Sequence, residues 1–95
     1  MSVIKFSSVQ EAVKRANATS YGLAAGVFSN DMDTVLTMVN SLQAGSVWVN
    51  CYEYITAQTP FGGYKMSGFG RELGEYGLHE YCEVKTVTIK FNSKL

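Results

Sequence analysis

The side chains that could carry chemistry in this sequence are two cysteines and a single histidine. Cys51 follows an apolar run at residues 47–49, a place where a nucleophile could stand at the end of a parallel strand. No histidine, lysine or arginine near it in the sequence would stabilise a thiolate, so a structural thiol is the favoured interpretation. His79 and Cys82 lie three positions apart, but two ligands without a second pair do not make a zinc site. We therefore expect no metal site, and a solvent-facing His79 on a short helix.

The other concentrated signal is glycine, because six of the nine glycines lie between Pro60 and Gly77. Residues 68–74 read G-F-G-R-E-L-G, which is one residue longer than the dinucleotide-binding fingerprint and follows a loop instead of a buried strand. A bend that permits close backbone packing is therefore favoured over phosphate binding. The aromatic residues of this loop could instead line an apolar ligand pocket.

Composition limits the kinds of partner that this chain could have. Hydrophobic residues make up 46% of the 95 residues and charged residues 17%, which argues against disorder. Eight basic residues balance eight acidic ones without any charge block, so we expect neither nucleic acid nor a membrane surface as a partner. The start lacks the pattern of a secretory signal, and two cysteines suit a reducing compartment. The sequence thus predicts one small domain, or a piece of a larger one, in the cytoplasm.

The elements that must position these residues follow from the spacing of apolar side chains. Runs at residues 3–6, 23–28 and 47–49 read as strands, the second of them buried on both faces. Helical spacing predicts one helix from a capping box at Ser8 to Asn17 and another from Met32 to about Leu42, with Gly45 as the helix-terminating glycine. The resulting order, β-α-β-α-β, indicates an α/β fold with a parallel sheet and right-handed crossovers.

The second half of the chain predicts a glycine-rich loop, a short helix at residues 73–81 and a final strand at residues 83–91. Both crossover helices would cover one face of the parallel sheet and leave the other face bare. Such a sheet offsets the entropy of folding poorly, so we expect these residues to have evolved within a larger chain or assembly.

Four runs of residues together carry a resemblance to a known family. They are W-V-N-C-Y at 48–52, P-F-G-G-Y-K-M-S-G at 60–68, G-R-E-L-G at 70–74 and E-V-K-T-V-T at 83–88. They resemble the C-terminal end of NAD(P)-dependent aldehyde dehydrogenases, especially the tetrameric cytosolic and mitochondrial group that oxidises retinal and aliphatic aldehydes. The resemblance implies an oxidoreductase that converts an aldehyde to a carboxylic acid through a cysteine thiohemiacetal and hydride transfer to NAD or NADP.

The family's catalytic motifs are not in this sequence. The nucleophile setting G-Q-x-C is missing, and residues 72–75 read E-L-G-E where the general-base motif would read E-L-G-G-K. The resemblance implies that the nucleotide-binding domain and the E-I-F-G-P segment lie before Met1. We therefore expect no catalytic or cofactor-binding residue in this segment, and an inactive isolated chain.

The resemblance does imply roles in substrate access. Phe61 would line the aldehyde entrance, Ile55 would be its variable neighbour that helps to set substrate width, and Asn50 and Cys51 would lie at the floor of the same loop. Residues 1–82 would then be the C-terminal part of the catalytic domain.

The resemblance also implies a subunit contact. Residues 83–95 would form an oligomerisation strand and tail in a homotetramer or homodimer, in the cytoplasm or alternatively the mitochondrial matrix. Its implied contact residues are Arg71, Glu83, Val87, Ile89 and Phe91. Two alternatives are a free interaction module that adds its strand to full-length subunits, and an independent nucleotide-binding loop protein.

Overall fold

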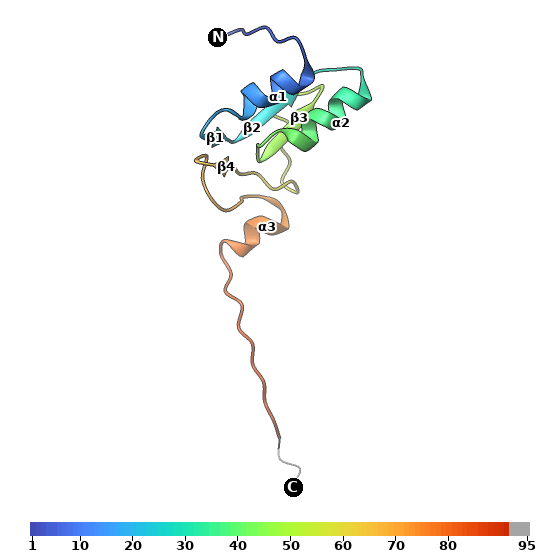
Figure 1. The fold of residues 1–95 in the computed structure, drawn as a ribbon. Helices are drawn as coiled ribbons and strands as arrows, with labels where there is room; N and C mark the ends of the chain where they lie inside the picture. The colour runs from blue at the N-terminus through green and yellow to red at the C-terminus, as the bar shows by residue number, and fades with distance from the viewer. Residues whose placement is uncertain (92–95) are drawn as a thin grey trace.

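The computed structural model describes residues 1–91 and places a small α/β body at the head of a long C-terminal arm (Figure 1). Strands β2 and β3 pair in parallel, from Ala24 opposite Ser46 to Val27 opposite Val49, and β1 pairs with β4 in antiparallel fashion. The elements in order are α1 (Val9–Asn17), β1 (Tyr21–Gly22), β2 (Ala24–Val27), α2 (Met32–Ser41), β3 (Ser46–Val49), β4 (Tyr64–Lys65) and α3 (Gly74–His79).

The two longer helices confirm the prediction from spacing and capping. The Ser8 hydroxyl accepts a hydrogen bond from the Glu11 N–H at 3.2 Å, and α1 ends at Asn17. The Glu11 carboxylate reaches back to the Ser7 N–H at 2.9 Å, one residue earlier than a standard capping box. Asp31 caps α2 by accepting from the Thr34 N–H at 2.9 Å. The two helices pack against each other beside the parallel strands (Figure 1).

The prediction of a strand at residues 3–6 was wrong. These residues form no strand and are exposed, and their nearest anchor is a hydrogen bond from the Arg15 guanidinium to the Lys5 carbonyl at 2.9 Å. A run of residues with high β propensity forms a strand only where a neighbouring strand can hydrogen-bond to its backbone. Here neither β2 nor β3 pairs with residues 3–6. The parallel sheet therefore has two strands instead of three, and the order is β-α-β.

The prediction that residues 23–28 are buried on both faces was also wrong. Leu23 and Phe28 are exposed, and Val27 and Val35 are the only buried hydrophobic residues in the described part of the chain. A two-stranded sheet with helices packed beside it leaves most of its apolar surface uncovered.

Gly45 does not terminate a helix as predicted, because α2 ends at Ser41 with Leu42 as its cap. Its N–H instead donates to the Gly22 carbonyl at 3.0 Å as the chain enters β3. A Cβ atom at Gly45 would lie 1.7 Å from the Gly62 carbonyl oxygen, so a larger residue would collide with the glycine-rich loop. Gly45 is thus a packing glycine.

The C-terminal region begins with α3, which confirms the short helix predicted at residues 73–81. Residues 83–91 then extend away from the body and are exposed along their length (Figure 1). They form no strand, because the described chain brings no partner strand to them, so their pairing with another subunit stays a prediction. The last four residues of the predicted tail, 92–95, lie outside the described residues. No helix within residues 1–91 is long and apolar enough to cross a membrane.

Candidate functional site

An open groove lies between β3 and the start of the glycine-rich loop. It has a volume of about 300 Å³ and is lined by Trp48 and its strand neighbours, by Ile55, and by Phe61 with the residues just before it. A second groove of about 420 Å³ shares Trp48, Ile55 and Phe61, and Leu23 and Tyr52 also line it. The structure therefore brings together two of the predicted substrate residues, Ile55 and Phe61, on walls common to both grooves.

The position of Phe61 is set by an isolated antiparallel bridge. The Phe61 N–H donates to the Glu72 carbonyl at 2.8 Å, and the Glu72 N–H donates to the Phe61 carbonyl at 2.9 Å. The next turn is also tied to the groove segment, since the Gly74 N–H donates to the Ala57 carbonyl at 2.9 Å. Residues 57–61 are thus held by the segment that leads into α3.

Asn50 lies at the ends of the parallel strands and lines neither groove. Its backbone N–H donates to the Val27 carbonyl at 2.8 Å, and its side-chain amide bonds both backbone groups of Ser29, at 2.9 and 3.0 Å. These three bonds hold Asn50 in a left-handed conformation with φ of 54°. Cys51 follows as an exposed thiol that also lines neither groove. These two predicted residues therefore do not line the grooves that Ile55 and Phe61 line.

The Arg71 side chain bonds to the backbone of the glycine-rich loop at two points. Its guanidinium donates to the carbonyls of Gly63 at 3.1 Å and Gly70 at 2.7 Å, and its charged carbon lies 5.7 Å from the centre of the Tyr64 ring. A Cβ at Gly62 would lie 2.6 Å from the Arg71 side chain, so the glycine there makes room for the arginine. The other predicted interface residues, Glu83, Val87, Ile89 and Phe91, are exposed on the C-terminal arm.

Ionisable groups are sparse around the grooves. Glu53 is the one carboxyl group that lines either of them, and their described linings contain no cysteine, histidine or lysine. The lowered pKa values lie instead at helix starts: the Thr34 hydroxyl and N–H lower the pKa of Asp31, and the hydroxyl and N–H of Ser7 lower that of Glu11. His79 is exposed on α3 beside the Tyr76 ring, and residues 1–91 bring no three metal-ligating side chains together. The grooves can therefore bind an apolar group, but their described linings contain no thiol.

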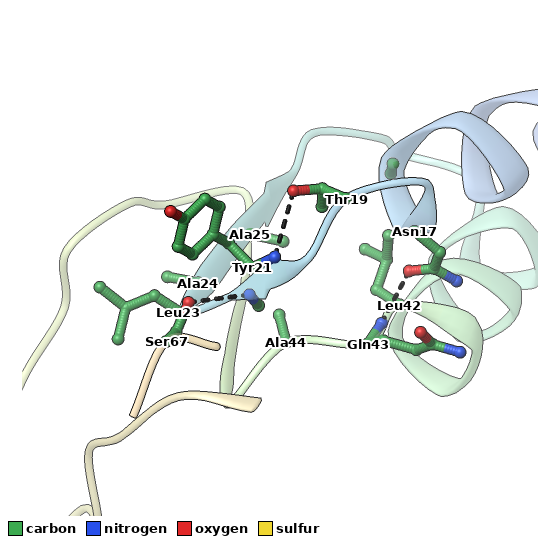
Figure 2. A pocket seen from close by; sticks show the side chains of 12 residues that line it. Asn17, Thr19, Tyr21, Leu23, Ala24, Ala25, Leu42, Gln43, Ala44 and Ser67 are labelled. Carbon is green, nitrogen blue, oxygen red and sulfur yellow. Dashed lines mark hydrogen bonds between the residues drawn. The ribbon is translucent and has the colours of Figure 1, made fainter. Parts of the chain in front are cut away.

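A separate cleft of about 330 Å³ lies where the ends of α1 and α2 meet β1 (Figure 2). The Asn17 side-chain amide donates to the Ser41 carbonyl at 2.8 Å. Its oxygen accepts from the Gln43 N–H at 2.9 Å, and the Ser67 hydroxyl accepts from the Gly22 N–H at 2.9 Å (Figure 2). Because these side chains are already bonded to backbone, the cleft is a structural junction more than a binding site.

Comparison with known proteins decides the family, because residues 1–87 match the Aldehyde dehydrogenase family. The chain belongs to this family. It is 64% identical over 92 residues to aldehyde dehydrogenase 1A1 of Macaca fascicularis, and the match covers 97% of this chain and 18% of that protein. It is equally similar, at 64%, to aldehyde dehydrogenase, cytosolic 2 of Macroscelides proboscideus, covering 97% of this chain and 38% of that one.

Solved aldehyde dehydrogenases share the fold described above. The NAD+ complex of the Bacillus cereus enzyme superposes with a TM-score of 0.87 at 50% identity, covering 92% of this chain and 18% of that one. Betaine aldehyde dehydrogenase of Staphylococcus aureus with NAD+ gives a TM-score of 0.78 at 50% identity, covering 80% and 15%. The predicted family and the α/β class are therefore confirmed, for a chain that spans about 18% of the length of aldehyde dehydrogenase 1A1.

Proposed function

We propose that this aldehyde dehydrogenase chain forms part of the aldehyde passage of an NAD(P)-dependent oxidoreductase whose bond-making residues lie outside this sequence. The observation that carries the proposal is the shared lining of both grooves by Ile55 and Phe61. Burial of apolar substrate surface against these walls stabilises binding by roughly 25 cal/mol for each Å². The shape of the walls therefore favours aldehydes of matching width. Asn50 would act on this passage through the backbone, because its side chain bonds Ser29 instead of facing the grooves.

We propose that this segment by itself binds no dinucleotide. Several donors of the glycine-rich loop are already engaged: the Glu72 N–H donates to the Phe61 carbonyl, the Ser67 N–H to the Tyr64 carbonyl, and the Arg71 guanidinium to two carbonyls of the loop. A phosphate cradle needs such N–H groups free and convergent. NAD+ is bound in solved relatives from Bacillus cereus and Staphylococcus aureus. For the whole enzyme we accordingly propose NAD or NADP held by residues other than these.

The C-terminal arm supports a second part of the proposal, which is assembly into a homodimer or homotetramer. Residues 83–91 are extended, exposed and without backbone partners in the described chain, as a strand that pairs with another subunit would be. We propose a division at residue 82 between the catalytic-domain part and the oligomerisation part. We place the enzyme in the cytoplasm, in keeping with the cytosolic relative, with the mitochondrial matrix as the alternative.

The same exposed arm favours a second candidate function, in which the free chain adds its strand to full-length subunits. Size-exclusion chromatography of this chain mixed with human aldehyde dehydrogenase 1A1 separates the two candidates. Co-elution at a larger size supports the interaction module, and separate elution supports the substrate-passage role alone.

The passage is tested in a chimaera, in which this chain replaces the matching 92 residues of human aldehyde dehydrogenase 1A1, its 62% identical relative. Phe61→Ala and Ile55→Ala should each change the ratio of kcat/KM between a long-chain and a two-carbon aldehyde by roughly 5- to 150-fold, equivalent to about 1–3 kcal/mol. Phe69→Ala is the matched control, because this exposed aromatic of the same loop lines neither groove. Unchanged ratios in both variants would overturn the proposal.

A further inference from the structure

The chain's single tryptophan, Trp48, lines the same two grooves as Ile55. We propose that Trp48 is a positioning residue that sets the width of the aldehyde passage by fixing the backbone at Ile55, an inference that rests on the proposed function. Trp48 stands on β3, lines both grooves and is half-buried, so it has a firm base in the sheet.

The first contact is a hydrogen bond to the peptide unit of Ile55. The indole Nε1–H of Trp48 donates to the Tyr54 carbonyl at 2.9 Å. That carbonyl belongs to the same planar peptide group as the Ile55 nitrogen. Holding the oxygen therefore holds the direction from which the Ile55 side chain leaves the backbone.

The second contact is aromatic and lies two residues earlier in the chain. The rings of Trp48 and Tyr52 meet edge to face, with centroids 5.1 Å apart and planes at 69°. Gly26, which pairs with Trp48 across the sheet, makes room for this ring. A Cβ at Gly26 would lie 2.9 Å from Cδ2 of Tyr52, closer than real Cβ atoms approach.

Glu53 lies between Tyr52 and Tyr54, the two residues that Trp48 contacts. Glu53 has φ of 56°, a left-handed conformation that a residue other than glycine rarely adopts without support. Such conformations persist where surrounding contacts hold them. Trp48 holds Tyr52 on one side of Glu53 and Tyr54 on the other, so loss of either contact would let the turn relax and move Ile55.

The test uses Trp48→Phe in the chimaera, which keeps an aromatic ring on β3 and removes the indole donor. The ratio of kcat/KM between a long-chain and a two-carbon aldehyde should shift at least threefold in the direction of Ile55→Ala, mainly through KM of the long-chain aldehyde. Because Trp48 acts through Ile55, adding Trp48→Phe to Ile55→Ala should change the ratio little further. Tyr76→Phe on α3 is the matched control for loss of one aromatic donor and should leave the ratio unchanged.

A general loss of folded enzyme lowers the rates with both aldehydes equally and leaves their ratio unchanged, so the ratio separates positioning from stability. If Trp48→Phe does not yield soluble enzyme, Gly26→Ala decides, because it displaces the Tyr52 ring and leaves the indole donor in place; a shift in the same direction supports the role. An unchanged ratio, or effects of Trp48→Phe and Ile55→Ala that simply multiply, would overturn the positioning role. Unchanged ratios in both Ile55→Ala and Phe61→Ala would instead overturn the proposed function.

Discussion

Phe61 and Glu72 exchange both of their backbone hydrogen bonds, at 2.8 and 2.9 Å, across the whole glycine-rich loop. The aromatic wall of the candidate passage is thereby tied to the segment that leads into α3. The Arg71 guanidinium adds bonds to Gly63 and Gly70 on the two sides of the same loop. The loop therefore works as a brace that positions Phe61.

This brace predicts the effect of Glu72→Pro in the chimaera. Proline removes the N–H that donates to the Phe61 carbonyl and restricts φ, so we expect a loss of about 1–3 kcal/mol in the free energy of unfolding and an altered aldehyde ratio. Glu72→Gln keeps the backbone donor and, because the side chain is exposed, should match the parent. Thermal unfolding and paired kcat/KM measurements check both. Equal stability of the proline and glutamine variants would contradict the brace.

The isolated chain should show no NAD-dependent oxidation of aldehydes. Covalent capture of an aldehyde needs a positioned thiolate. Cys51 lines neither groove, and the described linings of the two grooves contain no histidine or lysine. We expect NADH formation with propanal to equal that of a sample without protein, with human aldehyde dehydrogenase 1A1 as the positive control. Any excess of NADH over the protein-free sample would refute this expectation.

The exposed arm predicts that Val87→Pro weakens assembly of the chimaera. Proline removes one ladder donor from residues 83–91 and would misplace Val87, Ile89 and Phe91, whose burial would contribute roughly 1.5–3 kcal/mol each. We expect a shift from tetramer toward smaller species in light scattering at micromolar concentration. Val87→Thr keeps the donor and the β-branched shape, and should assemble like the parent. A proline variant that stays fully tetrameric would exclude this role for the arm.

The helix caps predict a measurable dependence on pH. Thr34 lowers the pKa of the Asp31 carboxyl through its hydroxyl and its N–H, so the ionised form is favoured in the folded protein. A carboxyl whose pKa is lower when folded stabilises the fold above its unfolded pKa, and that contribution disappears as the pH falls below about 4. Asparagine caps a helix without titrating, so Asp31→Asn in the chimaera should flatten part of this loss between pH 7 and pH 3. An Asp31→Asn variant whose thermal unfolding keeps the same pH dependence as the parent would contradict this contribution of the Asp31 carboxylate.

Local features of this protein could be predicted from the sequence because local contacts create them. The helices begin where Ser8 and Asp31 place an oxygen three residues before an N–H, and apolar spacing sets their length. The four runs at residues 48–52, 60–68, 70–74 and 83–88 together indicated the family, since a motif is a property of the chain and needs no geometry. The resemblance also predicted Phe61 and Ile55 as substrate-lining residues, and both line the two grooves.

Tertiary structure alone decided which of these residues meet. Residues 3–6 have strand propensity but no partner edge, whereas Tyr64 and Lys65, inside a predicted loop, pair with β1. The bond from Trp48 to Tyr54 depends on a left-handed turn at Glu53 that no local preference indicates. Strand pairing and turn anchoring join atoms far apart along the chain or in uncommon backbone conformations. Their energy depends on the position of the second partner, which the order of residues does not contain.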